Sequence, residues 1–179
     1  MGVIKTTRTP AVLALADGTV FRGFAFGASR DDSNPVVGEV VFNTSLYGYQ
    51  EILTDPSYAG QIMTFTYPHI GNYGCNTLDV ESSKVHTTAV VIRNESKVVS
   101  NYRANESLDH YLRSSDVPGI SGIDTRKLVK HIRDHGAQMG AIAHGSNISE
   151  EKLIEAARSA GSMLGKDYVT SVTCSEPYT

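Results

Sequence analysis

The most informative absence in this 179-residue sequence is that of lysine and arginine between positions 31 and 83. The sequence contains 16 Lys and Arg against 19 Asp and Glu, yet none of the cations lies in this cation-free segment. Five of the nine tyrosines do, at positions 47, 49, 58, 67 and 73. Depletion of lysine with enrichment of tyrosine is typical of surfaces that contact another protein. Tyrosines that cover a sheet face within the chain would give the same composition, so both interpretations stay open.

Other absences exclude whole classes of protein. Cys75 and Cys174 form no CxxC pair, which favours two reduced thiols over a disulfide. No run approaches the ~20 apolar residues that a membrane span requires, so we expect a cytoplasmic protein. Nucleic-acid binding is disfavoured, because phosphate contacts need clustered cations and the aromatic-rich segment has none. A hydrophobic content of 40% with 20% charged residues predicts a globular domain.

Motifs that carry common chemistry are also missing. The sequence has no GxSxG elbow, no GxxxxGK[ST] phosphate loop and no HExxH. Cys75 has His69 nearby but no cation to stabilise a thiolate, although a free-standing hydrolase built on Cys75 or a serine stays an alternative. His131 and His135 have the i, i+4 spacing of metal ligands, but their charged neighbours favour a solvated helix face. The residues therefore predict no metal site and no catalytic residue.

One further pair of candidates is acidic. Glu39 and Glu51 have the chemistry of paired carboxylates, but nothing in the sequence brings the two side chains together.

The hydrophobic pattern predicts a mixed α/β domain with a layered sheet. An Asp17-Gly18 turn joins the first two strands in a hairpin. The third helix is expected to end at Gly161, and the pattern fades from Gly165 onward into a strand remnant or a linker. Strands are expected over 12–15, 20–26, 36–42, 62–66, 89–92 and 137–143. Helices are expected after Ser107, after Asp124 with Leu128, Val129 and Ile132 inward, and near 147–149.

Several motifs together carry a family resemblance. They are GEVVFNTS at 38–45, LYGYQEILTDPSYAGQI at 46–62 and TYPHIGNYG at 66–74, supported by ADGTVFRG at 16–23, ESSKVH at 81–86 and IDTRKLVKHIRDHGAQMG at 123–140. In this order they resemble the N-terminal domain of the small, glutamine-hydrolysing subunit of carbamoyl phosphate synthetase. The resemblance covers nearly the whole chain.

The resemblance implies a fold and a division of labour. It implies a three-layer β/β/α domain of the swivelling type with a mixed sheet over 1–164, and a linker over 165–179 toward a class I glutamine amidotransferase domain. That second domain would carry the Cys-His-Glu triad, so this chain alone would be inactive. The parent enzyme, a ligase of arginine and pyrimidine biosynthesis, uses ammonia from L-glutamine to make carbamoyl phosphate on a large subunit. ATP and magnesium would bind there, and no cofactor would bind this chain.

Site residues follow from the same resemblance. Ser57 in the DPSY motif would contribute to glutamine binding in the neighbouring domain, whereas the alternative is that it only caps a turn. Ser45, Asp55, Tyr47 and Tyr49 would lie at the partner interface or along the ammonia route. The implied partners are the large subunit, the amidotransferase domain and L-glutamine. A different class of function stays open: an autonomous small-molecule binding module that uses the Tyr, Asn and Gly loops.

Overall fold

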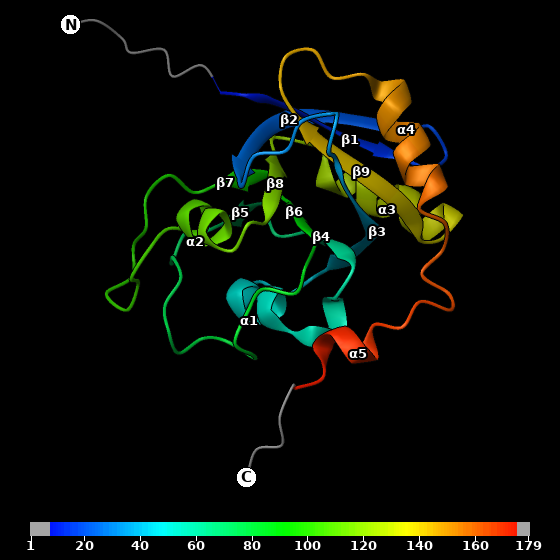
Figure 1. The fold of residues 1–179 in the computed structure, drawn as a ribbon. Coiled ribbons are helices and arrows are strands. Elements are labelled where there is room, and N and C mark those ends of the chain that lie inside the picture. The colour runs from blue at the N-terminus through cyan, green and yellow to red at the C-terminus, as the bar shows by residue number, and fades with distance from the viewer. Residues whose placement is uncertain (1–7, 175–179) are drawn as a thin grey trace, which may run out of the picture.

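Seven strands close into a barrel in the computed structural model of the chain, which describes residues 8–174 (Figure 1). Their order around the barrel is β1-β2-β8-β6-β4-β3-β9. The four strands β3, β4, β6 and β8 run parallel to one another, and the remaining neighbours pair antiparallel. The strands are β1 (Pro10–Leu15), β2 (Val20–Gly27), β3 (Val36–Asn43), β4 (Gln61–Phe65), β6 (Ala89–Val91), β8 (Pro118–Ser121) and β9 (Gln138–His144).

Helices surround this barrel, and a separate small sheet pairs β5 (His69–Ile70) with β7 (Asn94–Glu95). The longer helices begin where the sequence predicts. The side chains of Ser107, Asp124 and Ser149 each accept the backbone N–H of the residue three positions on, which satisfies a donor of the first turn. The helical elements are α1 (Tyr49–Thr54), the 3₁₀ turn η1 (Pro56–Tyr58), α2 (Leu108–Ser114), α3 (Thr125–His135), α4 (Glu150–Ser159) and α5 (Val169–Val172).

The barrel interior is filled by alternate residues of its strands. Leu13, Val40 and Ile62 point into one buried cluster, which α3 completes with Leu128 and Ile132. Because successive side chains of a strand face opposite sides, the residues between them point outward. Val129, predicted to face inward, is instead partly exposed, so the apolar stripe of α3 is narrower than its sequence indicates.

The outward-facing side chains are buried as well. Met63 and Phe65 of β4 pack in a cluster that contains residues of α1 and α2. On the other side, α4 covers β1 and β9, where Val12 and Ala141 meet Leu153 (Figure 1). Burial of both faces explains why these strands read as apolar runs without alternation.

The predicted class, mixed α/β with a mixed sheet, is confirmed, while closure into a barrel is an addition that the sequence did not indicate. None of the described helices is long and apolar enough to cross a membrane.

The C-terminal segment differs from its prediction in part. Residues 169–172 form helix α5, so the expectation of a strand remnant in this segment is wrong. Residues 175–179 lie outside the described part of the chain. The ring of Tyr168 packs on the backbone of Gly60, where a β-carbon would approach the ring to 2.5 Å. This contact places α5 beside the segment that carries α1 (Figure 1).

Candidate functional site

The five site residues predicted from the sequence all lie in the connection between β3 and β4, residues 44–60. Because β3 and β4 are parallel, this connection must cross from one end of the barrel to the other, and α1 and η1 form within it. Its position therefore depends on what holds α1 against the barrel.

The N-terminus of α1 is capped by a side chain from a distant part of the chain. Its N-cap residue is Gly48, whose φ of 83° lies in the left-handed region that glycine adopts without strain. The hydroxyl of Tyr73 accepts the backbone N–H groups of Gly48 at 2.6 Å and Tyr49 at 3.1 Å. The Tyr73 hydroxyl thereby satisfies the first-turn donors that an N-cap side chain would satisfy, which Gly48 cannot do.

Buried polar contacts hold the rest of α1. The hydroxyl of Tyr49 donates to the carbonyl of Gly74 at 2.6 Å. The Gln50 amide bonds both backbone groups of Asn76, accepting from its N–H at 2.9 Å and donating to its carbonyl at 2.6 Å. Because these groups are shielded from water, breaking one bond would leave an unpaired partner, so they fix the orientation of α1.

The DPSY motif forms a tight turn directly after α1. The Asp55 carboxylate accepts the backbone N–H of Ser57 at 2.8 Å, and Pro56 occupies the first position of η1. Proline fixes φ and the aspartate caps the turn, so the backbone here has little freedom. Ser57 itself is exposed, and within residues 8–174 its hydroxyl has no hydrogen-bond partner. The turn is thus capped by Asp55, and the Ser57 hydroxyl stays available to a neighbour.

A cavity of about 570 Å³ lies against this turn. Pro56 lines it together with residues 82–84, His86 and residues 171–174 of the C-terminal segment. The Nε2 of His86 lies 3.0 Å from the hydroxyl of Ser82, and burial together with the charge of Lys84 lowers the pKa of His86. The cavity is polar and carries a neutral imidazole at neutral pH.

The tyrosines of the cation-free segment divide between interior and surface. Tyr49 is only 2% exposed and stacks on Tyr73 with ring centroids 4.2 Å apart, and Tyr58 is partly buried. Tyr47 is 79% exposed and Tyr67 37%. The interpretation that tyrosines cover the chain's own interior therefore holds for Tyr49, while Tyr47 and Tyr67 stay exposed on the surface. The ring of Tyr49, expected at an interface, lies inside this chain.

The remaining exposed candidates cluster before α1. Ser45 is exposed, and its N–H donates to the side chain of Asn43 at 2.8 Å. Leu46, which the sequence did not single out, is 65% exposed beside Tyr47. These two neighbouring apolar side chains make the loop before α1 the candidate contact site of the segment.

The other sequence candidates lie apart from this site. Cys75 is fully buried, and burial with the charges of Glu106 and Glu51 raises its pKa to about 12. The Nε2 of His131 lies 2.6 Å from the Asp17 carboxylate.

His135 and the two glutamates are likewise engaged or separate. The Nδ1 of His135 lies 2.9 Å from a carbonyl of its own helix. Glu39 bonds the Gln61 amide from β3, whereas Glu51 belongs to α1. The two carboxylates share no hydrogen bond within residues 8–174.

Comparison with known proteins decides the family. Residues 13–142 match the family described as "Carbamoyl-phosphate synthase small chain, CPSase domain". The chain belongs to the carbamoyl phosphate synthase small-chain family. It is 55% identical over 168 residues to a carbamoyl phosphate synthase small chain of Syntrophotalea carbinolica and 53% identical over 169 residues to one of Pseudomonas putida. These matches cover 94% of this chain but only 43% and 44% of the two relatives. This chain corresponds to the N-terminal part of each relative.

Solved structures add less than these relatives. The structure of an aminopeptidase from Aneurinibacillus sp. strain AM-1 aligns with this chain at 16% identity and a TM-score of 0.40. The alignment covers 78% of this chain and 31% of the aminopeptidase chain. Such a likeness is too low to indicate a shared fold.

For a carbamoyl phosphate synthase small chain, the residues that sequence reasoning missed are those that position the site. Gln50, Tyr73 and Asn76 hold α1 and so determine where the DPSY turn lies. No local signal marks them, because each acts on a segment more than 20 positions away.

Proposed function

We propose that this chain is the non-catalytic assembly domain of the small subunit of a glutamine-hydrolysing carbamoyl phosphate synthase. Its membership of the small-chain family, over less than half the length of its relatives, is the observation that carries the proposal. In this role it docks on a large subunit and completes the glutaminase site of a class I amidotransferase domain. The reaction is that of a cytoplasmic ligase serving arginine and pyrimidine biosynthesis.

The chemistry is divided between chains in this proposal. The triad that hydrolyses L-glutamine belongs to the amidotransferase domain, and ATP and magnesium belong to the large subunit. This chain supplies shape and hydrogen-bonding groups. Cys75 is buried and protonated, and the two histidines of α3 are hydrogen-bonded to other groups of the chain. Both observations support a role in which this chain supplies no nucleophile. A three-layer β/β/α arrangement of the swivelling type with a linker after residue 164 stays part of the proposal.

Ser57 is the proposed glutamine-binding residue. The capped turn and Pro56 present its hydroxyl at the protein surface in a restricted geometry. A hydroxyl fixed before substrate arrives loses little conformational entropy when it bonds the substrate. Asp55 then acts as a positioning residue for Ser57, and the adjacent cavity with His86 marks the side that a neighbouring domain would cover.

The loop before α1 is the proposed contact with the large subunit. Ammonia released into neutral water becomes mostly ammonium, which lacks the lone pair needed for attack, so its route must exclude bulk water. Exposed Leu46 and Tyr47 beside Ser45 offer apolar area without a nearby lysine in sequence. Tyr49 supports this loop from inside through its stack on Tyr73.

Replacement of Ser57 tests the proposal in a complete small chain assembled with its large subunit. We expect Ser57→Ala to raise the KM for glutamine by about tenfold, the effect of losing one hydrogen bond to a charged substrate group. Ammonia-dependent synthesis stays at the wild-type rate, because it bypasses the glutamine site. Ser100→Ala, at an exposed serine before α2, is the matched control and leaves both activities unchanged. An unaltered glutamine KM in Ser57→Ala would remove Ser57 from the site.

A further inference from the structure

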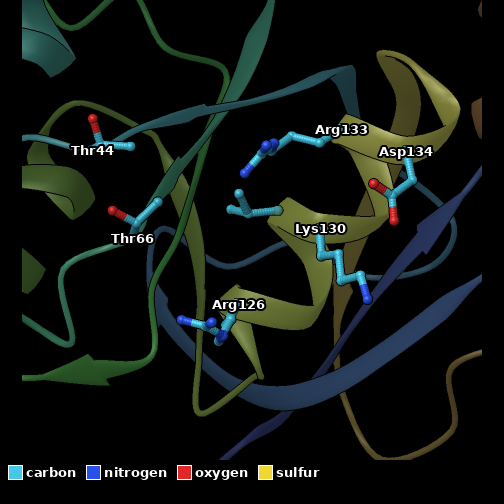
Figure 2. Close-up of a pocket in the computed structure, with 7 residues that line it drawn as sticks. Thr44, Thr66, Arg126, Lys130, Arg133 and Asp134 are labelled. Carbon is cyan, nitrogen blue, oxygen red and sulfur yellow. The ribbon is translucent and has the colours of Figure 1, made fainter.

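One face of α3 gathers three cations at i, i+4 and i+7: Arg126, Lys130 and Arg133. They line a cavity of about 510 Å³ whose other side is formed by Thr44 and Thr66. The lining also includes the apolar Val129 and one acidic residue, Asp134, which Figure 2 labels. We call this cavity the basic groove.

The topology of the barrel creates the groove. Thr44 follows the last residue of β3 and Thr66 the last residue of β4, so both lie at the carboxyl ends of neighbouring parallel strands. Figure 2 shows Arg126 and Arg133 extending toward the side of the two threonines, whereas Lys130 and Asp134 turn away from it. Two guanidinium groups therefore extend into the space between α3 and the strand ends.

The arginines of the groove differ from others of the chain in their pairing. Arg22 and Arg30 form ion pairs with carboxylates of other elements, at 2.5 Å and 2.8 Å. Within residues 8–174, Arg126 and Arg133 form none. A guanidinium carries five donors in a fork that matches a carboxylate, so two arginines without ion pairs in the described part of the chain give this groove the chemistry that suits carboxylates.

Helix α3 and strand β3, which border the groove, also border an apolar hollow. Between β3 and α3 lies a hollow of about 220 Å³ lined by Phe42 and Ile132. Beyond Thr44 the chain runs into the exposed Leu46 and Tyr47. Mixed basic and apolar contact over this length fits a polypeptide better than a small ion, which would use only the charges.

We propose that the basic groove docks an acidic segment of the large subunit, with carboxylates on Arg126 and Arg133 and an apolar residue in the adjacent hollow. The inference rests on the proposed function and adds the partner's chemistry and its place on this chain. The two arginines are seven residues apart on α3, about 10 Å along the axis, which suits two carboxylates of one segment. The acidity of the neighbouring cation-free segment disfavours nucleic acid as the occupant.

Charge reversal in the groove tests this inference. The dissociation constant between this chain and the large subunit is measured by titration calorimetry at 50 and 300 mM NaCl for wild type, Arg126→Glu, Arg133→Glu and Lys127→Glu. Lys127 is the matched control, because it lies on the same helix and faces the ring of Phe21. We expect each arginine reversal to weaken binding at least tenfold at low salt and to reduce its salt dependence, whereas Lys127→Glu binds like wild type. Thermal unfolding by circular dichroism verifies that each variant folds.

Each other result has a distinct meaning. If wild type binds and the arginine reversals bind equally well, the groove is not the docking site and the proposed function stands. If wild type fails to bind the large subunit, the proposed function and this inference both fail. Self-association that the reversals abolish, measured by sedimentation, would assign the groove to a second copy. Binding of inorganic phosphate that the reversals abolish, with unchanged large-subunit affinity, would assign it to a small anion.

Discussion

Tyr73 stacks on Tyr49 and at the same time caps the helix that begins with Tyr49. The ring centroids are 4.2 Å apart with planes 19° from parallel, and the Tyr73 hydroxyl accepts the N–H of Tyr49 at 3.1 Å. One side chain thus fixes both the side-chain packing and the start of α1. Together with the Gln50–Asn76 hydrogen bonds, this pair determines where α1 places the DPSY turn.

Removal of the Tyr73 hydroxyl should loosen α1 without disturbing the stack. In Tyr73→Phe the N–H groups of Gly48 and Tyr49 lose their acceptor, so the free energy of unfolding should fall by about 1 kcal/mol, a typical cost of losing a helix cap. Urea unfolding followed by circular dichroism measures the change, and amide hydrogen exchange at Gly48 and Tyr49 should accelerate. Tyr47→Phe, at an exposed ring, is the control. Equal stability of the two variants would show that the cap contributes nothing.

Cys75 should be chemically inert in the folded protein. Its pKa of about 12 leaves almost no thiolate at pH 8, and its side chain is fully buried. We expect iodoacetamide at pH 8 to alkylate the exposed Cys174, with Cys75 modified only after denaturant is added, as read by peptide mass spectrometry. Labelling of native Cys75 as fast as Cys174 would instead favour the free-standing hydrolase built on Cys75.

His144 should make stability depend on pH. Its Nε2 donates to the carbonyl of Gly119 at 3.1 Å and its Nδ1 accepts from the N–H of Arg30 at 3.4 Å, an arrangement of the neutral ring. Burial lowers the pKa of His144 below its ordinary value near 6.5, aided by the charge of Arg30 and only partly opposed by the hydrogen bond to Gly119. The unfolded state therefore binds a proton first as pH falls, so stability is complete above about pH 6.5 and declines below it.

Unfolding in urea at pH 7.5, 6.5 and 5.5 measures this decline. His144→Gln should have a shallower dependence than wild type, although His86, whose pKa is also lowered, leaves part of the slope. His69→Gln, at an exposed position, should keep the wild-type slope. A His144→Gln slope as steep as that of wild type would contradict the assignment.

Local signals in the sequence predicted those elements whose causes are local. The caps Ser107, Asp124 and Ser149 each act within three residues, and the helices begin where they indicate. The hairpin of β1 and β2 likewise follows from its turn. These elements need no information from distant parts of the chain.

Elements with distant causes escaped prediction. Helix α1 follows a glycine and takes its cap from Tyr73, 25 positions away. Strand β8 contains Pro118 and Gly119, residues that disfavour strands, and it forms by pairing with β2 and β6. The Phe26 ring packs where a side chain at position 119 would lie, which accounts for the glycine. Barrel closure depends on the pairing of β1 with β9, far apart in sequence. Tertiary packing decides each case.

The candidate site also has one part with local causes, which the sequence predicts, and one part with distant causes, which it does not. The DPSY turn was predicted from its motif, because Asp55 and Pro56 act on their immediate neighbours. The basic groove was not, because the cations of α3 read as a solvated face until the ends of β3 and β4 are placed opposite them. Only the closed barrel brings Thr44, Thr66 and the arginines together.

The most direct measurement of the central claim is the sedimentation of this chain mixed with the large subunit of carbamoyl phosphate synthase from the same organism. An assembly domain should move with the large subunit as a one-to-one complex at micromolar concentrations, without the amidotransferase half and without glutamine. Two independent boundaries at every ratio and at low salt would contradict the account.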